Sequence, residues 1–425
     1  MAVFTASMVY ADGSFRPNRY VSVQDGRIES ITETPPAGEA ATDFGDAAVF
    51  PGMVNTHTHS HLASLRGSVD QLAFDDWLAA VYRRVPKLDV DDVYASALLT
   101  YAEALLSGTT TTADFFYLNG YGNERIESAI RAAVDVGIRL VMGRTFMDAD
   151  WGGPATRETV EVAVERYRAL REAFAGHPRL EICPAPHSPY GASRGLLEAA
   201  HALAVEYDSR WYMHLAESES AAAGVSGVRA LDLLEDWGIL TDRLVAVHVV
   251  WLSEEELDRL GAVNGLVSYN PASNLFFGER IVDLVGYERR GISVALGTDS
   301  SASNNAQNMF ADLRLAALCQ RLRARDPAVI GVDDMLALAT SKGGRVTGLQ
   351  VGRLAPGNFA DFIVVDTTHP SLQPVEMLAS HLVYSMTPQA IKGVYVGGEQ
   401  VVWEGRVVKA DLAGAIDGIG ELSRR

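Results

Sequence analysis

Cysteine, long apolar runs and net positive charge are all scarce in this chain of 425 residues. The two cysteines, Cys183 and Cys319, lie far apart in apolar contexts, so we expect no disulfide framework and a reducing, cytoplasmic location. No run of about 18 apolar residues is present to span a membrane, and the first residues lack the pattern of a signal peptide. The formal net charge of −18 disfavours a nucleic-acid or anionic-membrane partner, because either partner needs a basic surface.

Both ends of the chain are rich in short strand patterns. Near the start, residues 20–23 and 27–31 flank Asp25-Gly26, a dipeptide typical of a two-residue hairpin turn. Near the end, residues 361–366, 394–398 and 401–408 have the same character. We therefore predict that residues 1–50 and 355–425 form one small β-sandwich, into which the middle of the chain is inserted.

The middle of the chain alternates between helix and strand patterns. Helical periodicity predicts helices over residues 93–106, 126–136, 158–174, 195–207 and 253–260. Short apolar runs typical of buried strands lie between them, over residues 140–144, 180–186, 211–214, 244–248, 265–269 and 292–299. This alternation predicts a parallel sheet closed into a (β/α)8 barrel over residues 51–354, and hence an α/β fold class.

The stretch PGMVNTHTHSH, residues 51–61, brings two histidines to the end of a predicted strand. In a strand, residues i and i+2 point to the same face, so His57 and His59 project together. That geometry suits two imidazoles on one metal ion. The alternative is a pair of unrelated surface histidines, since short motifs produce false matches.

Several predicted strands end in a polar residue of a catalytic type. These residues are His57, His59, His187, His214, His248 and Asp299. In a (β/α)8 barrel the carboxyl ends of the strands surround one site on the axis, so these side chains are predicted to converge. Each has a structural explanation when taken alone, His187 as a turn residue and His248 as a core histidine. The whole series at strand ends predicts a shared site.

Three imidazoles and one carboxylate make a nitrogen and oxygen site that suits Zn²⁺ or Fe²⁺ and leaves room for water. Such an ion lowers the pKa of water toward about 7. The reaction then needs a group that moves a proton. Glu217 lies three residues after His214, and zinc deaminases use a glutamate that is not a ligand for this step.

These motifs resemble those of the amidohydrolase superfamily, in the branch of S-adenosylhomocysteine and methylthioadenosine deaminases, triazine hydrolases and guanine or 8-oxoguanine deaminases. The matching stretches are PGMVNTHTH (51–59), LRG (65–67), APHSPY (185–190), HLAE (214–217), VHVVWLS (247–253), NPASNL (270–275), LGTDSSASNN (296–305) and GNFADFIVVD (357–366). They occur in the family order and cover almost the whole chain.

The resemblance implies a role for each site residue. It implies a metal ion held by His57, His59, His214 and Asp299. It also implies that His248 hydrogen-bonds the attacking water or the departing group, that Glu217 moves a proton to the ring nitrogen, and that Asp299 takes a proton from the water. The implied substrate-binding residues are His187, Arg144, Arg157, Trp77 and Asn274.

Lysine usage bears on the number of metal ions. Between residues 51 and 350 the only lysines are Lys87 and Lys342, and neither ends a predicted strand. Binuclear members of the superfamily use a carboxylated bridging lysine, which this chain lacks at a suitable place. We therefore predict one divalent ion, Zn²⁺ in preference to Fe²⁺.

The chain departs from the adenosine-type members at several positions. It has Tyr269 where they commonly have histidine, Phe276 and Phe277 where they have Lys-Leu, and Ser300 where they have glycine. The loop after Trp77 offers no glutamate of the kind that binds ribose in those enzymes. These changes leave the metal chemistry intact and the substrate open, and the two phenylalanines favour a flatter or more apolar ligand.

The leading prediction is metal-dependent hydrolytic deamination of an aminated N-heterocycle, such as a purine, an adenosine derivative or a pterin. One alternative is an s-triazine chlorohydrolase or N-dealkylating hydrolase that uses the same residues. Another is an inactive, amidohydrolase-like interaction protein, which should lack one or more ligands. We expect a small heterocyclic substrate and water as partners and, from the resemblance, a homo-oligomer, commonly a dimer.

Overall fold

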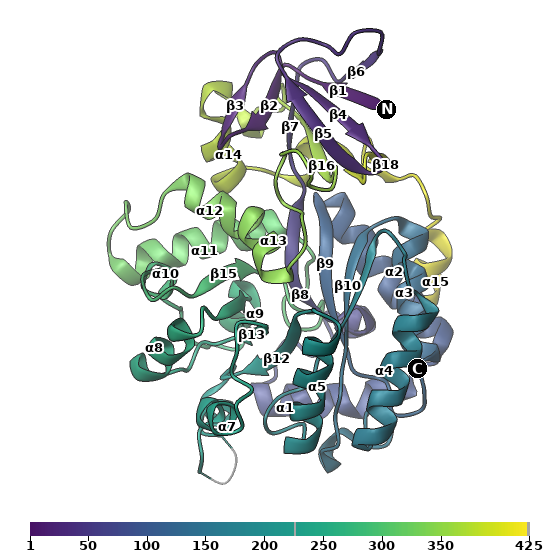
Figure 1. Cartoon of the computed structure of the whole chain (residues 1–425), viewed down its shortest axis with the longest axis vertical. Coiled ribbons are helices and arrows are strands. Elements are labelled where there is room, and N and C mark those ends of the chain that lie inside the picture. The colour runs from purple at the N-terminus through teal and green to yellow at the C-terminus, as the bar shows by residue number, and fades with distance from the viewer. Residues whose placement is uncertain (225–226, 423–425) are drawn as a thin grey trace.

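Eight parallel strands form a barrel at the centre of the molecule, in a computed structural model that describes residues 1–224 and 227–422 (Figure 1). They are β8 (Met53–Thr58), β9 (Thr109–Phe116), β10 (Arg139–Arg144), β11 (Leu180–Pro184), β12 (Trp211–Leu215), β13 (Leu244–His248), β14 (Leu266–Tyr269) and β15 (Ser293–Leu296). They pair in chain order as β8 to β11 and as β12 to β15, with every pair parallel. The predicted barrel is thereby confirmed.

Two joins close the barrel, and both lie beside the polar strand ends. Between β11 and β12, the amide of His214 donates to the carbonyl of His187 at 3.1 Å. Between β15 and β8, the amide of Asp299 donates to the carbonyl of His57 at 2.9 Å. The hydroxyl of Thr56 strengthens this second join by donating to the carbonyl of Leu296 at 2.9 Å. Residues predicted for the site therefore also complete the barrel.

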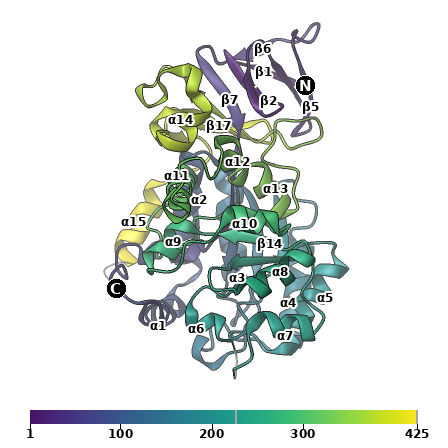
Figure 2. The same cartoon turned by 90° about the vertical axis from the view of Figure 1, so that its left-hand side faces the viewer.

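Helices form the outer layer of the barrel (Figures 1 and 2). They are α1 (Phe74–Arg84), α2 (Val90–Leu106), α3 (Glu124–Val136), α4 (Val160–Ala173), α5 (Arg194–Glu206), α6 (Glu219–Ala222), α7 (Ala230–Asp236), α8 (Glu254–Ala262), α9 (Pro271–Phe276), α10 (Leu284–Arg289), α11 (Met309–Ala324), α12 (Val332–Leu338) and α13 (Ser341–Thr347). Each predicted helix is present, and its ends lie within three residues of the predicted ends. None of the helices in the described part of the chain is both long and apolar enough to cross a membrane.

Strands from both chain ends form two sheets that pack together as the predicted sandwich (Figure 1). One sheet has the order β5 (Arg27–Thr32), β4 (Tyr20–Gln24), β1 (Ala2–Thr5), β6 (Ala41–Asp43). The other has the order β19 (Arg406–Val407), β18 (Glu399–Trp403), β17 (Ile391–Val396), β16 (Phe362–Asp366), β7 (Ala47–Pro51), β2 (Met8–Ala11), β3 (Ser14–Arg16). Phe4, Phe44, Phe362 and Tyr395 share the core between them. The Asp25-Gly26 turn joins β4 to β5 with positive φ at both residues, 50° and 76°, as its hairpin signature predicts.

A continuous stretch of chain connects the sandwich to the barrel, because β7 leads through Gly52 into β8. The buried guanidinium of Arg139, in β10, also donates to Asp361 beside β16 at 2.7 and 3.0 Å. Two helices, α14 (Leu378–Tyr384) and α15 (Ala413–Leu422), lie within the stretch predicted as sandwich. Helix α15 contacts α2 on the outside of the barrel (Figure 2). The exact domain boundaries, at 50/51 and 354/355, stay a prediction.

Candidate metal centre

Strand β8 carries the first two imidazoles of the site to the mouth of the barrel. His57 is in the strand and His59 follows it directly, with ring centroids 4.7 Å apart. The Nδ1 atom of His59 lies 2.6 Å from the carbonyl oxygen of Phe115, in β9, and donates its proton there. The other ring nitrogen, Nε2, is therefore left with a lone pair that points into the barrel mouth.

The third imidazole comes from the opposite half of the barrel. The Nδ1 atom of His214, in β12, lies 2.8 Å from the carbonyl oxygen of His187. This bond fixes the ring in the same way, and Nε2 of His214 lies 3.3 Å from Nε2 of His59. Carbonyl acceptors behind imidazoles are the usual device for orienting metal-binding histidines.

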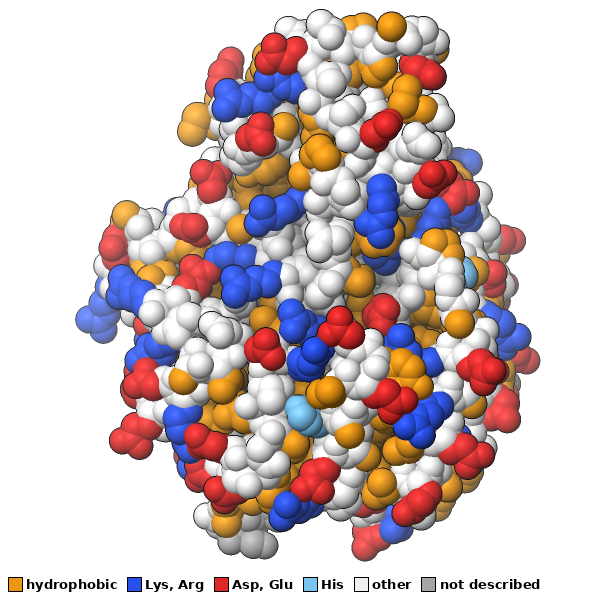
Figure 3. Space-filling view, in the orientation of Figure 1, with side chains coloured by type: hydrophobic (Ala, Val, Ile, Leu, Met, Phe, Trp, Pro, Cys, Tyr) orange, Lys and Arg blue, Asp and Glu red, His pale blue; other side chains and the backbone are white. Residues whose placement is uncertain are grey.

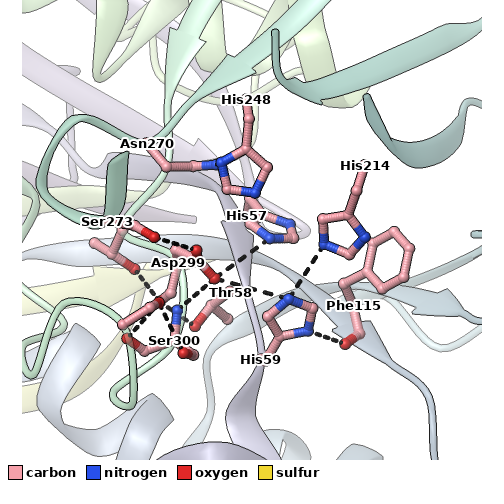
Figure 4. A network of polar contacts seen from close by, with 12 residues as sticks. His57, Thr58, His59, Phe115, His214, His248, Asn270, Ser273, Asp299 and Ser300 are labelled. Atoms are coloured by element: carbon pink, nitrogen blue, oxygen red, sulfur yellow. Dashed lines mark hydrogen bonds and ion pairs between the residues drawn. The ribbon is translucent and has the colours of Figure 1, made fainter. Parts of the chain in front are cut away.

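The carboxylate of Asp299 reaches the same point from the loop after β15. Its Oδ1 atom lies 3.5 Å from Nε2 of His57 and 3.7 Å from Nε2 of His59. Its orientation is fixed by the hydroxyl of Ser273, which donates to Oδ2 at 2.6 Å, and by the amide of Ser300, which donates to Oδ1 at 2.7 Å. Figure 4 shows the imidazoles and this carboxylate facing one another.

The arrangement fits a metal ion. Ligand atoms that lie about 2.0–2.1 Å from a tetrahedral zinc ion are about 3.3 Å from one another, close to the separations between His59, His214, His57 and Asp299. Within the described residues, neither ring nitrogen of the buried His57 has a hydrogen-bond partner. Ring nitrogens of three histidines and one carboxylate therefore converge on one point, an arrangement that a cation would satisfy.

A second polar group, formed by Glu217 and His248, adjoins this cluster. The carboxylate of Glu217 lies 3.3 Å from Nε2 of His248. The side-chain amides of Asn270 and Asn274 donate to Nδ1 of His248 at 3.2 and 3.1 Å. Because Nδ1 accepts these bonds, the proton of the neutral ring is on Nε2, where it can be donated to Glu217 or to a ligand beside it. One ligand atom each from Glu217, His248 and Asp299 lie within 4.8 Å of one another.

The electrostatics separate these groups by role. Burial raises the pKa of Glu217 well above its usual range, and the nearby Asp299 raises it further, which favours the protonated carboxyl. Burial, with the neighbouring His57, lowers the pKa of His59 to about 4, and burial lowers the pKa of His248 to about 3. Burial alone would raise the pKa of Asp299, but the close approach of His57 holds it well below its usual range. Neutral imidazoles and an ionised aspartate are the forms that bind a metal.

Strained backbone is concentrated at these strand ends. Ala216, His248, Val249 and Asp299 have φ values of 49°, 74°, 57° and 59°, in the left-handed region that such residues rarely adopt. Each lies in or next to a residue of the cluster. Strain of this kind persists where the surrounding structure holds a functional side chain in place.

The structure places the predicted substrate-binding residues in different surroundings. His187 lies beside the cluster, with its ring centroid 5.0 Å from that of His214. Asn274 binds His248. Trp77 is buried in α1 and donates from Nε1 to the carbonyl of Ala302 at 2.9 Å.

The two predicted arginines are paired with acids. The guanidinium of Arg144 is fully buried and donates to both oxygens of Glu158 at 2.8 Å. Arg157 is exposed and forms an ion pair with Asp150 at 2.8 Å. The substrate contacts of both arginines stay a prediction. In the structure, the guanidinium of Arg144 is bound to Glu158.

Sequence reasoning missed several groups that orient the cluster, among them one hydroxyl and one backbone carbonyl. Ser273, on α9, holds Asp299, and the backbone carbonyl of Phe115 holds His59. Ser273 lies within the NPASNL motif, but nothing in that motif marks its hydroxyl as a partner of Asp299. A backbone carbonyl leaves no sequence signal at all.

Comparison with known proteins agrees with this geometry. The amidohydrolase family model matches residues 48–401. A 5'-deoxyadenosine deaminase of Methanothermobacter thermautotrophicus is 33% identical over 394 residues, which cover 91% of this chain and 90% of the relative. A 5-methylthioadenosine/S-adenosylhomocysteine deaminase of Nitratidesulfovibrio vulgaris is 34% identical over 401 residues, covering 92% and 89%.

A solved structure extends the comparison to three dimensions. An adenosine deaminase from Xanthomonas campestris, solved with bound zinc, superposes with a TM-score of 0.90 at 25% identity, covering 100% of this chain and 98% of that one. The family match spans the barrel and the strands on either side of it, and it includes every residue of the cluster. The chain therefore belongs to the amidohydrolase family.

Proposed function

We propose that the chain is a metal-dependent deaminase that releases ammonia from the purine ring of an adenosine derivative. The observation that carries the proposal is the position of Glu217 and His248 beside the imidazole and Asp299 cluster. Such a cluster without a proton-transferring group would bind a metal but would not protonate a ring. Relatives named as deaminases of adenosine derivatives, at 33 and 34% identity over most of the chain, support the choice of substrate.

His57, His59, His214 and Asp299 would hold one Zn²⁺ ion. The ion supplies a Lewis acid that lowers the pKa of a water molecule toward about 7. No lysine takes part in the cluster: Lys342 is paired with Glu288 on the surface, and Lys87 lies in a short 3-10 helix beyond α1. A second ion bridged by a modified lysine is therefore not part of the proposal.

The residues of the chain have separate tasks in the reaction. Glu217, in the protonated form that its raised pKa favours, donates its proton to the ring nitrogen next to the amino-bearing carbon while water oxygen adds to that carbon. His248, with its proton on Nε2, donates a hydrogen bond on the side where the oxygen adds. Asp299, which is ionised, accepts a proton from the water. Asp299 then passes its proton to the amino nitrogen, the carbon–nitrogen bond breaks and ammonia leaves. The ring keeps the oxygen as a carbonyl and keeps the proton from Glu217 on its nitrogen, while the hydroxyl proton of the adduct returns to Glu217.

Ammonia release across a panel of heterocycles tests the proposal. We expect turnover of adenosine, 5'-deoxyadenosine, 5'-methylthioadenosine or S-adenosylhomocysteine, with little release from guanine, 8-oxoguanine, pterins and cytosine. Chloride or alkylamine release from s-triazines that exceeds ammonia release from every nucleoside would contradict the assigned substrate and favour the triazine alternative.

Two variants test the assigned roles. Glu217→Gln should keep one bound metal ion per chain and lose about 10²- to 10⁴-fold in kcat, the usual contribution of a proton-transferring side chain. His214→Ala should lose both the metal and the activity. Metal content measured by elemental analysis separates the two outcomes, and a fully active Glu217→Gln enzyme would rule out the proton role.

A further inference from the structure

The loop of residues 145–157, between β10 and α4, is hydrogen-bonded at both ends and along its length. The bidentate pair of Arg144 with Glu158 fastens its two ends, and both side chains are fully buried. The loop is also bound to the segment after β11, because the amide of His187 donates to the carbonyl of Phe146 at 3.1 Å and the amide of Ser193 donates to Asp148 at 2.8 Å. The loop therefore has a fixed position beside the site.

This loop presents a tryptophan to solvent next to the metal cluster. Trp151 is 41% exposed, which is unusual for a large aromatic side chain in an ordered loop. Its ring centroid lies 5.3 Å from that of His187, and His187 in turn lies 5.0 Å from His214. Trp151 is thus separated from a predicted metal ligand by one side chain.

Two tyrosines lie near both Trp151 and His187. The ring of Tyr82, in α1, lies 4.8 Å from that of Trp151, and Tyr190 lies 6.1 Å from it. Both tyrosines also approach His187, with ring centroids 6.2 Å from it for Tyr82 and 5.9 Å for Tyr190. Trp151, the two tyrosines and His187 therefore form one aromatic group beside the metal cluster.

A groove lies between Trp151 and α1. It has a volume of about 440 Å³ and is lined by Asp75, Leu78, Ala79, Tyr82, Arg83 and Trp151. The α1 residues recur at spacings of three, four and seven, so they form one stripe along the helix. The lining combines aliphatic and aromatic surface with one acid and one base, and so carries no net charge. We call it the α1 groove.

We infer that the α1 groove receives the 5'-substituent of the adenosine derivative and that Trp151 selects for a thioether there. A purine whose amino-bearing carbon faces Glu217 must direct the rest of the nucleoside toward the mouth of the barrel, where Tyr82 and Trp151 lead into the groove. Sulfur and the carbons attached to it make favourable contacts with aromatic rings. The inference rests on the proposed function and adds to it the residue that distinguishes among adenosine derivatives.

The test compares kcat/KM for 5'-methylthioadenosine and S-adenosylhomocysteine with kcat/KM for 5'-deoxyadenosine, which lacks the thioether. The zinc-loaded native enzyme should prefer both thioethers, and Trp151→Ala should reduce that preference about 10- to 100-fold, the range for losing a small apolar contact in a pocket. Tyr121→Ala is the matched control. Tyr121 is an exposed aromatic residue, 58% accessible, whose ring contacts Arg125, and its removal should leave the preference unchanged.

The outcomes are separable. If the native enzyme deaminates none of these nucleosides, the proposed function fails and the inference fails with it. If it deaminates them but Trp151→Ala keeps the thioether preference, only the inference fails. If Trp151→Ala lost the preference for only one of the two thioethers, the inference would also fail, because both substrates carry the thioether that Trp151 is inferred to contact. A Tm of Trp151→Ala equal to that of the native enzyme would show that a loss of preference does not come from a loss of fold.

Discussion

The carboxylate of Asp299 is oriented by two hydrogen bonds that come from different elements. One is the amide of Ser300 and the other is the hydroxyl of Ser273, 2.6 Å from Oδ2. Since partners behind a metal ligand keep it in place and tune its basicity, Ser273→Ala should weaken zinc binding about 10- to 100-fold. Competition with a chelator measures the affinity.

A serine remote from the site provides the control for this change. Ser128 is buried in α3 and donates to the carbonyl of Val90 at 2.7 Å. Ser128→Ala removes a comparable hydrogen bond and should leave zinc affinity unaltered. Equal zinc affinity for Ser273→Ala and the native protein would show that Asp299 needs no support from α9.

A second buried acid, Asp312 in α11, makes the stability of the protein depend on pH. Burial raises the pKa of Asp312 to about 7, against a value near 4 for an unfolded chain. Between these two values the folded protein binds a proton that the unfolded chain does not, so the free energy of unfolding should fall as pH rises from about 4 to about 7. The fall should amount to a few kcal/mol.

Asp312→Asn isolates this effect, because the amide carries no titrating proton. Urea unfolding at several pH values should show a smaller decline in the variant than in the native protein. Identical slopes for the two proteins would mean that another group causes the decline. The comparison needs no activity measurement, since Asp312 contacts Asn304 and the amide of Ala272 rather than the metal cluster.

At the scale of elements, the buried ion pair between Arg144 and Glu158 holds together the two ends of the loop that carries Trp151, residues 145–157. Arg144→Met leaves Glu158 buried with Arg166 as its remaining charged partner, at 2.9 Å. We expect a loss of about 3 kcal/mol in the free energy of unfolding, because one partner of a buried pair has been removed. The double variant Arg144→Met/Glu158→Leu should recover part of that loss. Urea unfolding of the three proteins measures it.

The stability and the KM of Arg144→Met, measured together, decide between two roles for Arg144. The resemblance to adenosine-type enzymes implies that this arginine contacts substrate, whereas the structure shows its guanidinium bound to Glu158 and Asn123. A variant with native stability and a raised KM would favour the substrate contact. If Arg144→Met is destabilised and its KM changes equally for every nucleoside, the structural ion pair with Glu158 is favoured.

The features predictable from sequence were those with a local signal. Alternating strand and helix periods predict the barrel, Asp-Gly turns predict hairpins, and polar residues after apolar runs predict the imidazole cluster. The partner of Arg144 was not predictable, because Glu158 lies fourteen residues further on, at the start of a predicted helix, and a helical pattern does not show which distant side chain a residue contacts. Trp151 was missed for the same reason, since its position over His187 depends on how three loops pack.

At the scale of the whole molecule, the surface and the site have different charge patterns. Acidic and basic side chains are interspersed over the face seen in Figure 3, as expected for a protein whose substrate is a small molecule. Within the part of the chain that the structure describes, the groups with metal-binding geometry are all drawn from His57, His59, His214, Glu217, His248 and Asp299 at the barrel mouth. The predicted dimer remains a prediction.

Metal removal should affect the whole barrel. A ligand that binds only the folded state adds stability as its concentration exceeds the dissociation constant, about 4 kcal/mol at a thousandfold excess. We therefore expect chelation to lower Tm by several degrees, and readdition of zinc to restore it. A Tm insensitive to chelation would show that the cluster binds no metal tightly.

The stabilisation by a bound metal ion is expected at the two joins that close the barrel. His187 with His214, and His57 with Asp299, hold the ends of the sheet together through their backbones, and the side chains of His214, His57 and Asp299 belong to the metal-binding cluster. A bound zinc ion would therefore stabilise the join between β11 and β12 and the join between β15 and β8 together. In hydrogen–deuterium exchange, the amides of His214 and Asp299 should exchange faster after chelation, while amides of the distant sandwich keep their rates.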